Sequence, residues 1–139
     1  MKKTILYLLT LISLTCCSSS DSPAVDPIVG KWFIYKTVYE TDGNINAVYN
    51  YDIHEQCGAE SLEVSSANNY IVETYYTNED CTGFSATGGW YWSNEDDGNY
   101  NIFQSGQTIP QRNAVLNGDD LIVTEPDNIT VVKYYKKVD

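Results

Sequence analysis

The sequence predicts an all-β fold, an antiparallel up-and-down meander of about eight strands that closes into a β-barrel. The 139 residues include 12 Tyr, 3 Trp and 3 Phe, together with many Val, Ile and Thr, and these residue types favour strands. Turn signals separate the strand-like runs at roughly 8–12-residue spacing, which is typical of barrels. No apolar stripe of helical period exceeds one turn, so we expect no long helix in the folded domain.

The first half of the domain contains four strand-like runs. The first places Trp32, Ile34 and Val38 on one face, and a Thr-Asp-Gly-Asn turn ends it. The second run is weaker, and the third and fourth are separated by an Ala-Asn-Asn turn. The four runs cover residues 31–39, 45–51, 61–65 and 70–77.

The second half contains five runs, and we expect eight or nine strands in all. An acidic turn at residues 94–99 and the hairpin signal Asn117-Gly118-Asp119-Asp120 punctuate them. Closure of such a meander hides the edges of its outermost strands. The five runs cover residues 89–93, 100–104, 108–117, 121–124 and 129–137.

Residues 1–16 have the pattern of an export leader. Lys2 and Lys3 precede an apolar run at residues 5–14, which is shorter than the roughly 20 residues that a membrane-spanning helix needs. The stretch Leu14-Thr15-Cys16-Cys17 resembles a bacterial lipobox, with Leu where the lipobox has Leu. The resemblance implies that residues 1–16 are a lipoprotein signal peptide and that Cys17 is the lipidated first residue of the mature chain. Two alternatives are lipidation of Cys16, which fits the pattern less well, and a plain secretory signal.

The rest of the chain divides into a tether and one domain. Residues 17–26 are polar and contain Pro, which predicts a flexible tether from the lipidated cysteine. Residues 27–139 are the size of a single domain. The expected location is the bacterial cell envelope, most simply the outer membrane, with the membrane face left open.

Two of the four cysteines remain for the domain once Cys16 and Cys17 are assigned to the leader and the anchor. Because disulfides persist outside the cytoplasm, we predict a Cys57–Cys81 disulfide. It would close a loop of about 25 residues and add roughly 3–4 kcal/mol in the chain-entropy model. Two free thiols or a metal pair are the alternatives, but neither cysteine has a Cys or His at zinc-ligand spacing.

The formal net charge is −11, and loss of Lys2 and Lys3 with the leader makes the mature chain more acidic. Binding to nucleic acid requires Lys and Arg directed at phosphates, so this balance argues against a nucleic-acid partner. It also argues against electrostatic docking on anionic lipid, which leaves the acyl chains as the link to the membrane.

A Gly-X-Trp motif opens the first predicted strand at Gly30-Lys31-Trp32. With the meander that follows it, this opening resembles the lipocalins, and more closely the small lipocalin-like domains of bacterial lipoproteins. In those domains a cysteine pair joins the front half, and a second Gly-X-Trp opens a mid-chain strand, as Gly88-Gly89-Trp90 does here. The resemblance covers the chain from about residue 27 onward and implies a barrel that holds a small ligand. The Thr-Asp-Tyr loop and the C-terminal helix of animal lipocalins are missing, so their ligands are not transferred.

The motif has a physical reason. Gly30 lets the backbone enter the barrel wall closely, and Trp32 is large enough to plug one end of an eight-stranded barrel. In lipocalins a basic side chain from late in the chain lies over this Trp. The candidates here are Lys133, Lys136 and Lys137.

The sequence offers little support for catalysis, so we predict that the protein is not an enzyme. His54 is the only histidine, and no Gly-X-Ser-X-Gly motif accompanies it. The acids at residues 95–97 miss the spacing of a calcium loop. We predict no cofactor and no bound metal.

Aromatic side chains are the best candidates for ligand binding. Trp90 and Trp92 share one face of a strand, and Tyr70 can lie on a facing strand, so we expect these three to line the mouth of an open barrel. The same alternation also arises in a filled core.

Two functions follow from these observations. The first is a lipid-anchored carrier of a small apolar ligand. The second is a surface interaction module with a filled barrel that binds a protein or glycan partner. An open cavity of a few hundred cubic ångströms favours the first, and the sequence leaves the oligomeric state open.

Overall fold

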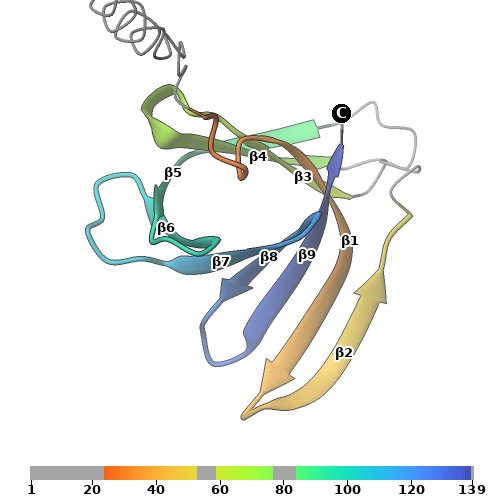
Figure 1. Cartoon of the computed structure of the whole chain (residues 1–139). Helices are drawn as coiled ribbons and strands as arrows, with labels where there is room; N and C mark the ends of the chain where they lie inside the picture. The colour runs from red at the N-terminus through yellow and green to blue at the C-terminus, as the bar shows by residue number, and fades with distance from the viewer. Residues whose placement is uncertain (1–23, 53–58, 77–83, 139) are drawn as a thin grey trace, which may run out of the picture.

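The computed structural model describes residues 24–52, 59–76 and 84–138 and shows an all-β, antiparallel barrel, so the predicted fold class is confirmed (Figure 1). Among these residues the sole helical element is a 3-10 turn, η1, at Ala67–Asn69. The strands are β1 (Gly30–Thr41), β2 (Asn44–Asn50), β3 (Glu60–Val64), β4 (Tyr70–Tyr76), β5 (Phe84–Asn94), β6 (Asn99–Gln104), β7 (Arg112–Asn117), β8 (Asp120–Glu125) and β9 (Thr130–Val138).

Eight of the nine strands close the barrel, and β2 is an extra strand. The strand order is β2-β1-β3-β4-β5-β6-β7-β8-β9, and an additional pairing of β1 with β9 completes the ring. From β3 to β9 each strand pairs with the next one along the chain, as the meander predicted.

The departure from a simple meander lies in β1, which is 12 residues long. Its first part, Gly30–Phe33, pairs with β3, and its later part, Lys36–Thr41, pairs with β2 on the same edge. The β1–β2 hairpin therefore continues past the barrel wall (Figure 1). Ile45, Val48 and Tyr49 of β2 are exposed.

The starts of two strands differ from the sequence prediction by more than two residues. β5 begins at Phe84 and not at residue 89, because two glycines in its middle hid the earlier part of the strand. β7 begins at Arg112 and not at residue 108, because Pro110 has no N–H to donate to a ladder. The predicted hairpin is present, with Asn117 paired to Asp120.

Trp32 closes one end of the barrel. Its side chain is 1% exposed, and its indole Nε1 donates a hydrogen bond of 2.8 Å to the carbonyl oxygen of Ile28. Among the three candidate lysines, Lys137 lies over the Trp32 ring, 5.3 Å from its centroid. Gly30 has a φ of +145°, a backbone angle that favours glycine, and a Cβ there would lie 2.7 Å from Cε of Lys137 and would displace the end of that side chain.

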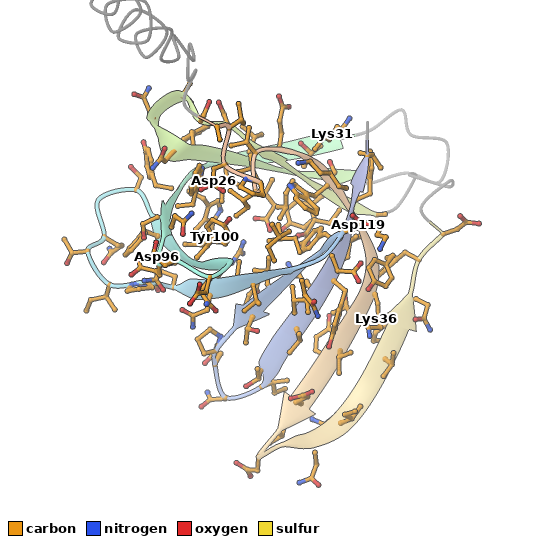
Figure 2. All side chains as sticks on the ribbon, in the orientation of Figure 1. Asp26, Lys31, Lys36, Asp96, Tyr100 and Asp119 are labelled. Carbon is orange, nitrogen blue, oxygen red and sulfur yellow. The ribbon has the colours of Figure 1, made fainter. Side chains whose placement is uncertain are left out.

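The segment before β1 is fixed to this closed end by Asp26. Its Oδ1 accepts hydrogen bonds from the Tyr100 hydroxyl and the Ile28 N–H, and its Oδ2 accepts one from Asn94. Figure 2 shows Asp26 close to Tyr100 of β6. Burial raises the pKa of Asp26, but these hydrogen bonds together lower it by more, so its pKa lies below the usual value. The predicted tether boundary at residue 26 therefore falls on a residue that is bonded to the barrel.

Candidate functional site

A partly open cavity of about 270 Å³ is formed by residues of the barrel. Residues of β1, β3, β4 and β9 line it, together with Tyr51, which follows β2. Three tyrosine rings and two oppositely charged side chains form part of its wall, so the cavity combines aromatic and ionic surfaces. Its lining residues are Ile34, Thr37, Tyr39, Tyr51, Ala59, Glu60, Tyr75 and Lys133.

A group of five buried or half-buried charged residues, which we call the charged cluster, adjoins this cavity. Arg112 of β7 lies 3.0 Å from Glu73 of β4 and 3.1 Å from Glu125 of β8. Lys133 of β9 lies 2.8 Å from Glu60 of β3 and 3.0 Å from Glu125. Two of these ion pairs, Arg112–Glu73 and Lys133–Glu60, join strands that are not neighbours in the ring, and of the five residues Glu60 and Lys133 line the cavity.

Glu60 is the cluster member whose ionisation the barrel disfavours. Burial and the negative charge of Glu73 raise its pKa to about 7, although Lys133 and a hydrogen bond from the hydroxyl of buried Tyr135 oppose that rise. Glu60 therefore takes up and releases a proton near neutral pH.

Glu73, Arg112 and Lys133 remain charged. Burial alone would raise the pKa of Glu73, but the positive charge of Arg112 and a hydrogen bond with Glu60 lower it. Burial alone would lower the pKa values of Arg112 and Lys133, but the neighbouring carboxylates raise both. Burial, and then the charges of Glu60 and Glu73, raise the pKa of Tyr75, so its hydroxyl stays protonated.

The side chains of Trp90 and Trp92 both face the barrel interior, where each ring packs against neighbouring side chains. Trp90 is half-buried and stacks on Arg112, whose guanidinium carbon lies 4.0 Å from the ring centroid. Trp92 is 6% exposed, packs edge-to-face on Tyr100 and donates a hydrogen bond to the carbonyl oxygen of Ser65. Neither tryptophan lines the cavity.

Tyr70 lies on the opposite face of the sheet from the two tryptophans. The ladder pairs Tyr70 with Tyr91, and their rings contact edge-to-face with centroids 5.5 Å apart. Because directly paired residues share a face, and Tyr91 alternates with Trp90 and Trp92, Tyr70 is directed outward. Its hydroxyl accepts a hydrogen bond from the N–H of Gly89. The structure thus separates the three residues that the sequence analysis grouped at one mouth.

A second hollow, of about 650 Å³, opens broadly on the outer side of β1 and β9. Tyr51 borders both hollows. The Lys136–Asp120 ion pair at its margin is largely exposed, with Nζ and Oδ1 3.0 Å apart. The open shape and the solvated charges make this hollow a weaker candidate than the smaller cavity. Its lining residues are Tyr35, Asn50, Tyr51, Asp52, Asp120 and Lys136.

Several predicted residues lie outside the described part of the chain. These are the lipidation site Cys17, the disulfide pair Cys57 and Cys81, and His54. Within the described residues, no group of three or more His, Cys, Asp or Glu side chains is arranged to hold a metal ion. No described helix has the length and apolar character that crossing a membrane requires.

The sequence analysis missed the charged cluster, although the strand alternation marks its members. Glu60 shares a face with Leu62 and Val64 of β3, and Glu73 shares a face with Ile71 of β4. A charge at an inward position of a strand needs a partner, because an unpaired buried charge is costly. That rule identifies Glu73 within its predicted strand, and it identifies Glu60 once the third strand is extended to its observed start at residue 60.

The fold and the cavity define a closed eight-stranded barrel with a charged interior. Comparisons of the chain with models of known protein families, with curated proteins and with solved structures find no match. The lipocalin resemblance therefore stays a prediction from the sequence motifs.

The raised pKa of Glu60 predicts a pH-dependent stability. Because the folded state binds this proton more tightly than the unfolded chain, its stabilising contribution is complete below about pH 4.5 and is lost as the pH rises through about 7. We expect the unfolding free energy, measured by urea denaturation from about pH 5 to about pH 8, to fall over this range. Glu60→Gln should flatten this slope. Glu63→Gln, on the same strand but facing solvent, should keep it, and equal slopes in the two variants would contradict the prediction.

Proposed function

We propose that this protein is a non-enzymatic, lipid-anchored protein of the bacterial cell envelope whose lipocalin-like barrel binds a small molecule. The observation that carries the proposal is the cavity of about 270 Å³ formed by residues of the barrel. Its volume suits a compact ligand, since pockets for larger ones usually start at about 300 Å³. A binding function needs only this cavity and groups that orient the ligand.

The lining favours an amphipathic ligand over a wholly apolar one. Tyr39, Tyr51 and Tyr75 offer ring surface to an apolar or aromatic body. Glu60 and Lys133 offer charge and hydrogen-bonding atoms to a polar group. A wholly apolar ligand would cover these charged groups without satisfying them, which costs free energy.

A cavity-filling variant tests the binding site. We expect a fluorescent amphipathic dye to bind the wild-type protein saturably with one site, because the cavity is small and is lined by residues of the barrel. Ala59 is buried and lines the cavity, so Ala59→Leu should weaken dye binding by about tenfold or more by occupying the space. Dye titration followed by fluorescence provides the measurement.

The matched control is Ala67→Leu, the same change at an exposed position of η1, which does not line the cavity. It should bind the dye as the wild type does, and both variants should keep a cooperative melting transition. Equal dye affinity in the Ala59→Leu and wild-type proteins would remove the cavity as the site.

The membrane anchor is tested separately. With Cys17 as the lipidated residue, Cys17→Ser should release the protein from the membrane fraction, because the acyl chains are the proposed link to the bilayer. Fractionation of cells and mass spectrometry of the N-terminal peptide give the measurement. A Cys17→Ser protein that stays in the membrane with its lipid would contradict the assignment.

A second candidate function is the interaction module, and one observation favours it. β2 is an edge strand of the sheet. It carries no charged residue, and its side chains Ile45, Val48 and Tyr49 are exposed. Exposed, uncharged edge strands pair readily with a strand of a protein partner. The dye titration separates the two functions, since a barrel that binds no ligand leaves the module as the better proposal.

A further inference from the structure

The charged cluster contains one more negative group than positive groups. Glu60, Glu73 and Glu125 face Arg112 and Lys133, so the five side chains sum to −1 when all are ionised. Tyr75 and Tyr135, which also face the cluster, remain neutral because burial raises their pKa values. An excess charge inside a barrel is costly unless a proton or another cation compensates it.

The excess falls on Glu60, at the cavity wall. Arg112 contacts both Glu73 and Glu125, while Lys133 is shared by Glu60, Glu125 and, at 3.8 Å, Glu73. Glu60 therefore has a share of one cation, a hydrogen bond from the hydroxyl of Tyr135 and a hydrogen bond with Glu73. Its pKa of about 7 agrees with this arrangement, because the carboxyl group takes up a proton in place of a missing positive charge.

We propose that the cavity binds a small ligand with a protonated amine attached to an aromatic or apolar body, with the amine placed against Glu60. This inference rests on the proposed binding function and names the class of ligand. An ammonium group donates hydrogen bonds to a carboxylate and compensates its charge. The rings of Tyr39, Tyr51 and Tyr75 line the same cavity and contribute cation–π and apolar contacts.

An anionic ligand fits the same cavity poorly. Lys133 is the positive group on the cavity wall, and its Nζ already lies 2.8 Å from Glu60 and 3.0 Å from Glu125. A carboxylate or phosphate that approaches Lys133 would meet these two glutamates and increase the excess negative charge. The cavity thus favours a cationic ligand by attraction and disfavours an anionic ligand by repulsion.

Three matched probes test the charge preference by isothermal titration calorimetry on the mature protein. Phenethylamine, phenethyl alcohol and hydrocinnamate share one aromatic ring and a short chain, and they differ in charge. We expect phenethylamine to bind about tenfold or more tightly than the other two, the range that a charge-assisted hydrogen bond supplies. Near pH 6 its binding should release the proton of Glu60, so the measured heat should depend on the ionisation enthalpy of the buffer.

Two variants test whether Glu60 is the residue that binds the amine. Glu60→Gln should weaken phenethylamine by about tenfold or more, abolish the proton release and leave phenethyl alcohol unchanged. Glu63→Gln, whose side chain faces solvent three residues along β3, should behave as the wild type. If the alcohol or the acid binds as tightly as the amine, the cavity function stands and the amine preference is overturned. If none of the three probes binds and the dye also fails, both proposals are overturned.

Discussion

Trp32→Ala should lower the unfolding free energy by about 3–5 kcal/mol, a large part of the stability of a domain of this size. The substitution removes a side chain that is 1% exposed and plugs the end of the barrel. It also removes the hydrogen bond to the Ile28 carbonyl and the surface that Lys137 covers. Urea denaturation followed by circular dichroism measures the change.

Two further variants show whether the loss of unfolding free energy comes from the buried ring of Trp32. Trp32→Phe keeps most of the apolar volume but leaves the Ile28 carbonyl without its donor, so it should cost about 1–3 kcal/mol. Tyr91→Ala removes an aromatic ring that is 37% exposed and should cost less than Trp32→Ala. A Trp32→Ala protein that unfolds at the wild-type urea concentration would show that the closed end does not hold the barrel together.

Arg112→Met should cost about 3–5 kcal/mol, the effect of removing one partner from a buried ion pair. Glu73 has a side chain that is 3% exposed, and Arg112 lies 3.0 Å from it. Loss of the guanidinium also removes the charge that pairs with Glu125 and the group that stacks on Trp90. The unfolding free energy at about pH 7, where Glu73 is ionised, gives the measurement.

The double variant Arg112→Met with Glu73→Gln should recover part of that loss, because it removes the buried negative charge as well. Lys136→Met is the surface control, since its ion pair with Asp120 is 41% and 33% exposed and should contribute less than about 1 kcal/mol. If Arg112→Met and Lys136→Met lower the unfolding free energy by the same amount, the buried charged cluster stabilises the fold no more than a surface ion pair does.

The strand meander could be predicted because each turn is encoded locally. The Asn117-Gly118 hairpin and the acidic turn before Asn99 occur where the sequence analysis placed them. The branching of β1 could not be predicted, because its two halves pair with different strands along one edge. That division depends on where the barrel ends in space, and no local pattern records it.

The interior of the barrel was predicted less well than its wall. The alternation of Trp90 and Trp92 correctly places both rings on one face, but it does not reveal that Arg112 and Tyr100 pack against them. The charged cluster forms only when β3, β4, β7, β8 and β9 come together around the ring. Its members are far apart in the sequence, so their pairing depends on closure and on the register of every intervening strand.

The pairing of the first strand with the last also sets an order for folding. Lys31 lies opposite Val138, so the ring cannot close until the final strand has been synthesised. Until then β1 presents an unpaired edge from Lys31 to Glu40, which is available to other chains. Closure between such distant segments gives the fold a high contact order, and we expect slow folding on the timescale of barrels and sandwiches. A chain that emerges N-terminus first therefore depends on protection of β1 during its synthesis and transport.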